Sequence, residues 1–191
     1  MATKKGYCEM INKIKINPFD KIKQCTSCQL HKFRRNVVLG RGDMPADVLY
    51  IGEAPGKSED LIGEAFIGPS GALLDSLMVD AAREAFLPAI PRFYLINTVL
   101  CRPTDEKQGD NRAPSSLEVC SCTENIMQIV KRVNPHLTIC VGKVAEKYYN
   151  KEFGLTHSIQ HPSYILRVGG KNTPIYKHNF RLLCEAFEAL K

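Results

Sequence analysis

The sequence predicts a three-layer α/β/α sandwich around a short, mainly parallel four-stranded sheet. Short apolar runs that end at glycine or a polar residue alternate with segments whose apolar residues recur at helical spacing. This alternation is typical of parallel strands covered by helices on both faces. The length of 191 residues suits one core, so we expect a single domain over residues 1–191.

Four strands are expected, and their ends should form one edge. Three are the buried apolar runs at residues 47–52, 92–98 and 137–142, and a shorter fourth strand precedes His161. In sheets of this kind the ligand lies beyond the carboxyl ends of the strands. Gly52, Asn97, Gly142 and His161 are therefore expected to border one cleft.

Helices are expected between these strands. They begin at Pro69, near Ser116 and at Lys143, and the helix that begins at Lys143 should reach Lys151. Pro135 should end the second of them, because proline cannot continue a helix. The chain is expected to divide into a helical lead-in at 1–24, a core at 25–167, and a loop and amphipathic helix at 168–191, with the helix over 176–190.

The charge and the N-terminus limit the class of protein. A net charge of +6 and a pI near 8.9 suit a polyanionic partner, although charge alone indicates only non-specific attraction. No run approaches the ~18 apolar residues of a membrane span. Polar residues follow the basic N-terminus where a signal peptide needs an apolar stretch. We expect a cytoplasmic protein, or one of the host cytoplasm or nucleoid if it is viral.

Eight cysteines suggest ligation rather than disulfides, because cytosolic thiols are kept reduced. Cys25 and Cys28 form a C-x2-C pair, Cys101 follows the second strand, and Cys120 and Cys122 begin a helix. From this spacing alone, zinc and an iron–sulfur cluster are equally good interpretations, and ordinary thiols are the alternative. The others are assigned to packing: Cys8, Cys140 and Cys184.

A tight turn follows the first predicted strand, at Gly52, Glu53, Ala54, Pro55 and Gly56. Its glycines and proline let backbone N–H groups face a ligand, and a plain strand-to-helix turn is the alternative. Glu53, Glu59 and Asp60 then place three carboxylates in one short loop. They form either a solvated acidic surface or a base that activates water.

The segment His161-Pro162-Ser163 follows the fourth predicted strand. A histidine before proline is more often structural, but its expected place at the shared sheet edge favours a role in a site. Leu166 and Arg167, expected on the following loop, suit an apolar wedge and a phosphate contact. Phe66 is either a core residue or a flat surface on which a base stacks.

Taken together, these motifs resemble the family 4 uracil-DNA glycosylases over the stretch from Cys25 to about Arg167. The order and spacing of the motifs make the resemblance specific. The matching pieces are Cys25–Leu30, Val38–Gly42, Gly52–Gly56, Glu59–Asp60, Gly63–Gly68, Asn97 with Cys101–Pro103, Asn111–Pro114 and His161–Ser163.

The resemblance implies a [4Fe–4S] cluster held by four cysteines. The ligands that match the family are Cys25, Cys28 and Cys101. The fourth is Cys120 or Cys122, and we favour Cys122 because Glu118 and Pro135 stand at the family's spacing from it. In this family the cluster looks structural, anchoring loops near DNA rather than transferring electrons.

The resemblance also implies a pocket that recognises uracil. Phe66 should stack on the flipped base. Asn97 should read the N3–H and O4 edge through its amide, which both donates and accepts and so rejects cytosine. The backbone from Gly52 to Ala54 should line the pocket, together with Ser163.

The implied reaction is hydrolysis of the N-glycosidic bond to free uracil and an abasic site. His161 should stabilise the charge that develops on uracil O2, and backbone around Gly52 should complete that anion pocket. Glu53 or Glu59 should position the attacking water or crowd the C5 atom of the base. No lysine is placed for lyase chemistry, so a monofunctional enzyme is expected.

The implied partner is uracil-containing DNA, single- or double-stranded, bound by a monomer. Activity should be higher on single strands and U·G pairs than on U·A pairs, because a base that is already unpaired or mismatched is cheaper to flip.

One departure from the family pattern supports a different reading. Only about ten residues separate Lys151 from His161, where the family has a longer segment with a hairpin. The alternative function is therefore a weak or inactive homologue that binds uracil-containing or damaged DNA. A zinc-stabilised nucleic-acid-binding module is a third possibility.

Overall fold

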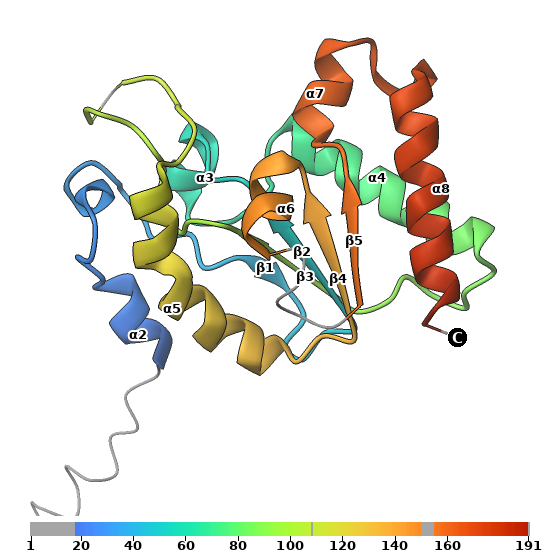
Figure 1. The fold of residues 1–191 in the computed structure, drawn as a ribbon, viewed down its shortest axis with the longest axis horizontal. Coiled ribbons are helices and arrows are strands. Elements are labelled where there is room, and N and C mark those ends of the chain that lie inside the picture. The colour runs from blue at the N-terminus through green and yellow to red at the C-terminus, as the bar shows by residue number, and fades with distance from the viewer. Residues whose placement is uncertain (1–17, 108, 150–154, 191) are drawn as a thin grey trace, which may run out of the picture.

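The computed structural model describes residues 18–107, 109–149 and 155–190. One five-stranded sheet lies at its centre, in the order β1-β3-β2-β4-β5 (Figure 1). The four parallel strands are β2 (Val48–Gly52), β3 (Phe93–Asn97), β4 (Leu137–Val141) and β5 (Leu155–Ile159). The antiparallel edge strand β1 (Arg41–Gly42) makes the predicted count of four wrong, because two residues are too few to show a periodic pattern.

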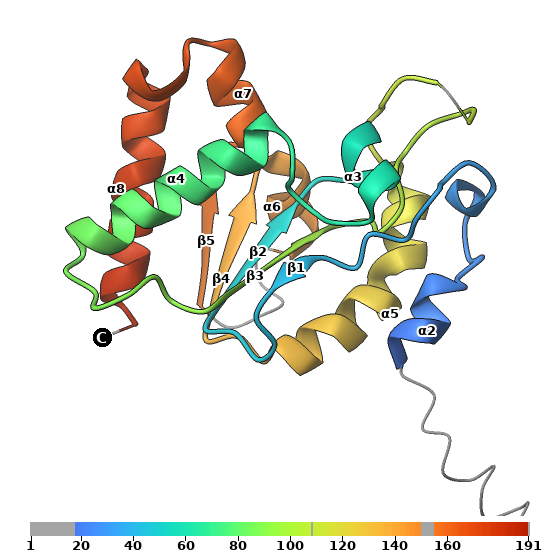
Figure 2. The same ribbon diagram turned by 180° about the vertical axis from the view of Figure 1, so that it is seen from behind.

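Helices cover both faces of this sheet, which confirms the predicted α/β/α sandwich (Figures 1 and 2). The first face packs on α4 (Pro69–Glu84), α7 (Pro162–Arg167) and α8 (Pro174–Glu188). The second packs on α2 (Pro18–Lys23), α5 (Ser116–Val133) and α6 (Lys143–Tyr149). Side chains alternate along each strand, so that Tyr50 of β2 joins the first layer and Ile51 the second.

Local capping explains where the longer helices begin and end. Ser115 and Glu118 form a capping box at the start of α5, and Asn134 ends that helix in the left-handed conformation at φ 49°. The prediction of a helix from about Ser116 that stops before Pro135 is therefore confirmed. Helix α8 begins two residues before the predicted start, because the Thr173 side chain accepts the N–H of Tyr176. The predicted end of the 143–151 helix lies outside the described residues.

Two segments that were expected to be loops are short helices. Glu59 and Asp60 lie in α3 (Lys57–Ile62), and Leu166 and Arg167 lie in α7. Each helix has six residues, which is too short for an apolar repeat to be recognised. The remaining elements are the 3-10 turns η1 (Gln29–Lys32) and η2 (Gly170–Asn172).

The strand order places β2 between β3 and β4, with α4 crossing one face of the sheet and α5 the other. This is a topological switch point, where the carboxyl ends of neighbouring strands leave an open crevice. In Figure 1 the arrowheads of β4 and β5 point to the end of the sheet flanked by α3 and α7. None of the described helices is long and apolar enough to cross a membrane.

Candidate functional site

Three predicted residues meet where β2 and β3 end. A Cβ atom on Gly52 would overlap the Phe66 ring at Cζ and would lie 2.7 Å from Asn97 Oδ1. Asn97 is only 4% exposed, and no described residue forms a hydrogen bond with its side-chain amide. Both the donor and the acceptor of the amide are therefore available, so this position suits a ligand that offers the complementary pair.

Phe66 is held in place by residues that the sequence did not single out. Its φ of +56° is unusual for a bulky residue, and Arg41 stabilises this conformation by donating to the carbonyls of Ala65 and Phe66 at 2.9 and 3.3 Å. Arg41 is itself fixed by Asp75 at 2.7 Å. A Cβ atom on Gly71 would overlap the Phe66 carbonyl oxygen. Arg41 lies inside the 38–42 motif, so that motif could have indicated a role for this arginine.

The turn after β2 is fixed to the end of β3. Thr98 donates its N–H to the Gly52 carbonyl at 2.9 Å and its hydroxyl to the Glu53 carbonyl at 2.6 Å. Thr98 is fully buried, and nothing in the sequence pattern distinguished it from a core residue. The backbone of Gly52 and Glu53 is therefore rigidly positioned beside Asn97.

The three carboxylates near this turn have different surroundings. Glu59 accepts the N–H groups of Gly56 and Gly68 at 3.2 and 3.3 Å, so it joins the turn to the Phe66 segment. Asp60 is buried and accepts the N–H groups of Arg35 and Asn36. An acidic surface loop is therefore the wrong description for these two.

Glu53 is the third carboxylate, and its side chain makes no hydrogen bond to another described residue. Burial raises the pKa of Glu53 above its ordinary value. A carboxylate without hydrogen bonds inside a cavity is free to accept a proton from a ligand or a water molecule.

His161 caps the N-terminus of α7. Its Nδ1 accepts the Ser163 N–H at 3.2 Å and lies 2.8 Å from Ser163 Oγ. Because Nδ1 accepts from a backbone N–H, the ring proton of the neutral histidine lies on Nε2. Burial, and then the charge of Arg167, lower the pKa of His161 to about 4. At neutral pH the ring therefore presents a neutral Nε2–H donor.

The backbone around His161 is held from two sides. Gly142 has a φ of +92°, and a Cβ atom there would lie 3.0 Å from His161 Cβ. Asn179 of α8 both donates to the Gln160 carbonyl at 2.8 Å and accepts the Gln160 N–H at 2.9 Å. The fully buried Asn179 thus fixes the residue before the histidine.

A cavity of about 440 Å³ brings together residues from both halves of the predicted site. Its lining is Glu53, Ala54, Pro55, Gly56, Asn111, Arg112, Ala113, His161, Ser163 and Arg167. A neighbouring cavity of about 900 Å³ shares Glu53 and His161 and extends to Lys143, His178 and Arg181. Phe66 and Asn97 line neither cavity and lie against Gly52, and Leu166 is 41% exposed outside both.

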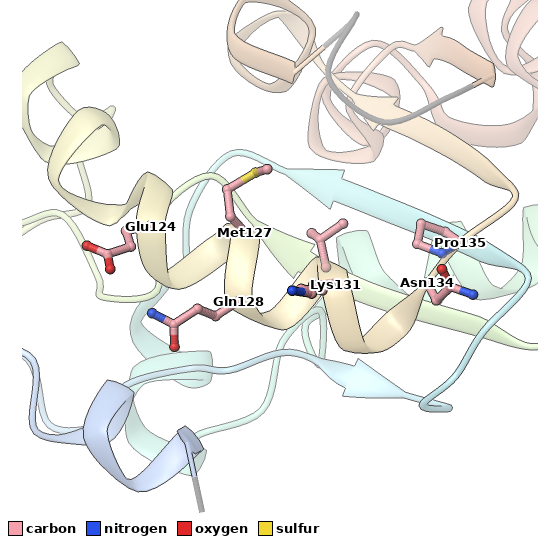
Figure 3. A pocket seen from close by; sticks show the side chains of 7 residues that line it. Glu124, Met127, Gln128, Lys131, Asn134 and Pro135 are labelled. Carbon is pink, nitrogen blue, oxygen red and sulfur yellow. The ribbon is translucent and has the colours of Figure 1, made fainter.

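Another hollow lies on the outer face of α5, away from these residues (Figure 3). It is lined by Glu124, Met127, Gln128, Val130, Lys131, Asn134 and Pro135, and it contains none of the predicted site residues.

Four cysteines from three separate segments surround one small cavity. They are Cys25, Cys28, Cys101 and Cys122. Cys120 is exposed and is not among the lining residues. Of the cysteines assigned to packing, Cys140 is buried in β4 and Cys184 is half-buried in α8, and Cys8 lies outside the described residues.

Donors point at the sulfur atoms of this cavity. Arg34 Nη1 lies 3.3 Å from Cys101 Sγ, Asn125 Nδ2 lies 3.3 Å from Cys25 Sγ, and the Leu100 N–H lies 3.4 Å from Cys122 Sγ. Hydrogen bonds to sulfur and nearby positive charge are what an anionic thiolate centre requires. Arg34 and Asn125 were not predicted, because each is an ordinary polar residue in the sequence.

The four cysteines of this cavity are the residues that could hold a metal centre. Among the described residues, no three His, Cys, Asp or Glu side chains are grouped closely enough, as they stand, to hold a metal ion. A lone zinc ion would need thiolates at about 2.3 Å from one point. Burial raises the pKa of Cys101 to about 11 and that of Cys122 to about 12, so a metal centre bound there would have to displace these protons.

Comparison with known proteins identifies the family. The model of the uracil DNA glycosylase superfamily matches residues 39–191. A type-4 uracil-DNA glycosylase of Archaeoglobus fulgidus is 33% identical over 78% of this chain, and one of Thermotoga maritima is 30% identical over 78%. The chain belongs to the uracil-DNA glycosylase superfamily, in its type-4 family.

The type-4 relatives differ in how much of their length is matched. A relative from Saccharolobus solfataricus is 32% identical over 71% of this chain. The matched residues cover 59% of that relative, 68% of the Archaeoglobus fulgidus protein and 81% of the Thermotoga maritima protein. The chain thus spans less than two thirds of the Saccharolobus relative.

Proposed function

We propose that this chain is a monofunctional uracil-DNA glycosylase, which hydrolyses the N-glycosidic bond of uracil in DNA to free uracil and an abasic site. The observation that carries the proposal is the neutral Nε2–H of His161 in a cavity shared with Glu53, beside the Gly52–Asn97 strand ends. A fixed neutral donor and an unpaired carboxylate are the two groups that this hydrolysis needs. Membership of the type-4 family supports the same reaction.

Recognition of the base is assigned to Asn97 and Phe66. A flipped uracil presents an N3–H donor and an O4 acceptor, which the unpaired Asn97 amide complements. Cytosine presents the reverse pattern, an acceptor followed by a donor, and would leave the buried amide unsatisfied in that orientation. The aromatic ring of Phe66, next to the same glycine, is the stacking surface.

Bond cleavage is assigned to His161 and the turn after β2. As the glycosidic bond breaks, negative charge develops on uracil O2, and the Nε2–H of His161 donates to that atom. Backbone N–H groups from Gly52 to Ala54 complete the anion pocket, and Thr98 keeps them rigid. Glu53 accepts the proton of the attacking water, because Glu59 is already held by two backbone N–H groups.

Contact with the DNA backbone and the cofactor completes the proposal. Arg167 and Ser163 line the cavity, and the exposed Leu166 beside them in the chain is the apolar wedge that replaces the flipped base. The cysteine cavity would hold a [4Fe–4S] cluster, whose chemistry there is to cross-link three chain segments. The substrate is uracil-containing DNA, single- or double-stranded, acted on by a monomer.

The proposal is tested by incubating the purified protein with uracil-containing oligonucleotides and then with alkali, which breaks the strand at abasic sites. We expect strand breaks with single-stranded uracil DNA and U·G duplexes, fewer with U·A duplexes, and none before alkali. A protein that binds these oligonucleotides but releases no uracil would contradict the proposal and favour a non-cleaving homologue.

The shape of the site predicts the effect of a single methyl group. Changing Gly52 to Ala should reduce uracil release by about 10²-fold or more, because the new Cβ would displace the Phe66 ring and the Asn97 amide. Gly68→Ala is the matched control, since its Cβ would approach only Glu59 Oε1, at 3.5 Å. Single-turnover rates measure the effect. Equal rates for the two variants would show that uracil does not bind at Gly52.

The pH dependence should come from Glu53. Burial raises the pKa of Glu53 above its ordinary value, whereas His161 becomes charged only near pH 4. As the pH falls, Glu53 is therefore protonated first and can no longer accept a proton, so the rate should fall on the acid side before His161 becomes charged. Glu53→Gln should be slower and lack this acid limb, and Glu64→Gln, an exposed control, should keep it. An unchanged limb in Glu53→Gln would remove Glu53 from the mechanism.

A further inference from the structure

We propose that Arg102, Arg35, Lys57 and Lys107 form a phosphate-binding site, which holds the DNA backbone beside the candidate active site. The inference rests on the proposed function for the identity of its ligand, a phosphodiester of the substrate strand. The four cationic side chains line one cavity of about 240 Å³ next to α3.

The first support is the buried charge of Arg102. This residue is only 3% exposed, and its guanidinium donates to Asn111 Oδ1 at 2.5 Å and to the Gly109 carbonyl. Both partners are neutral, and its Nη1 has no hydrogen-bond partner among the described residues. A buried charge without a counter-ion is strongly unfavourable, so the cavity that Arg102 lines should receive an anion.

Three other arginines of the chain pair with carboxylates, which makes the lack of such a partner for Arg102 among the described residues unusual. Arg41 pairs with Asp75, Arg92 with Asp47, and Arg112 with both Asp105 and Glu118. All three are more exposed than Arg102, yet each has a carboxylate within 2.8 Å. Arg102 has no such carboxylate within the described part of the chain, although it is the most buried of these arginines.

The charge of the cavity lining is the second support. Arg35, Lys57 and Lys107 are exposed, and none of them forms an ion pair with another described residue. Asp60 is the one carboxylate of this lining, and one of its oxygens already accepts two backbone N–H groups. Four cations against one occupied carboxylate leave a strongly positive hollow, which suits the phosphates of a nucleic acid.

Continuity with the candidate active site is the third support. Asn111 accepts from Arg102 and also lines the cavity that contains Glu53 and His161. Lys57 directly follows Gly56, which lines that same cavity. A strand whose uridine enters the active-site cavity would therefore carry a neighbouring phosphate to Arg102. Arg167 lines the same cavity from α7, which lies apart from α3 (Figure 1), and would hold the strand beyond the flipped nucleotide.

The test measures binding of a labelled, uracil-free single-stranded oligonucleotide at several salt concentrations. The Lys57→Gln/Lys107→Gln variant should bind about tenfold more weakly, and the slope of log affinity against log salt should fall by about 0.7 for each phosphate that is no longer neutralised. The enzyme concentration needed for half-maximal single-turnover uracil release should rise by a similar factor, because these lysines hold backbone and not the reacting base.

Lys131→Gln is the matched control, because it removes an exposed lysine from the outer face of α5 (Figure 3). Arg102→Gln, checked for its fold by circular dichroism, should lose more affinity than the Lys57→Gln/Lys107→Gln variant or Lys131→Gln. Affinity and salt slope of the double variant equal to those of Lys131→Gln would overturn the inference. A protein that releases no uracil, but whose double variant still loses affinity and slope, would keep the phosphate site and refute only the proposed function.

Discussion

Replacing His161 with alanine is expected to slow uracil release by about 10²- to 10³-fold, the usual cost of removing one fixed donor from an anion pocket. The donor is the Nε2–H that the Ser163 N–H orients through Nδ1. Because the ring is neutral above about pH 4, the loss should be the same at pH 6 and pH 8. Single-turnover release of uracil, followed by alkali cleavage, measures it.

His136 supplies the control for this experiment. It is an exposed histidine before β4, and His136→Ala should retain the full rate. His161→Ala should also keep its affinity for uracil-free DNA, since the histidine is assigned to the reacting base. A His161→Ala protein that releases uracil within a few-fold of the unmodified rate would refute the assigned role.

The second large effect is expected from a pair of cysteines two positions apart. Cys122→Ser should lose the proposed iron–sulfur cluster and with it much of the protein's thermal stability, because the cluster would join three chain segments. Cys120→Ser should retain both, since Cys120 is exposed outside the cavity. Iron and acid-labile sulfide per chain, together with the melting temperature, measure the difference.

The outcome separates three possibilities. Equal iron and sulfide contents in the two variants would show that Cys122 is not a ligand. Loss of iron and sulfide only in Cys120→Ser would show that Cys120 is the fourth ligand instead. Zinc without sulfide in the unmodified protein would contradict the cluster itself. An iron–sulfur protein should also be coloured, which gives a direct check on purification.

Much of the fold could be predicted from the sequence because its main signals are local. Apolar runs mark β2, β3 and β4, and proline and capping residues mark the ends of α4 and α5. The short elements could not be predicted. β1 has two residues, and α3 and α7 have six each, so their conformations depend on contacts with distant segments.

The candidate site was predictable only where its residues follow strands. Gly52, Asn97 and His161 stand at or just after strand ends, and sheet topology brings them to one edge. The supporting residues were not predictable, because Arg41, Thr98 and Asn179 act through backbone carbonyls that only the folded chain places beside them. Arg102 could not be predicted either, because only the folded chain shows that this buried arginine has no carboxylate partner among the described residues.

The cysteine cavity also bears on how such a protein would be made in a cell. Its thiols come from the segment after α2, the loop after β3 and the middle of α5, so a cluster would close two long loops at once. The yield of folded chain would then depend on the supply of iron and sulfide during synthesis. Iron-starved cells should therefore contain fewer molecules of the protein, each with an unaltered turnover rate.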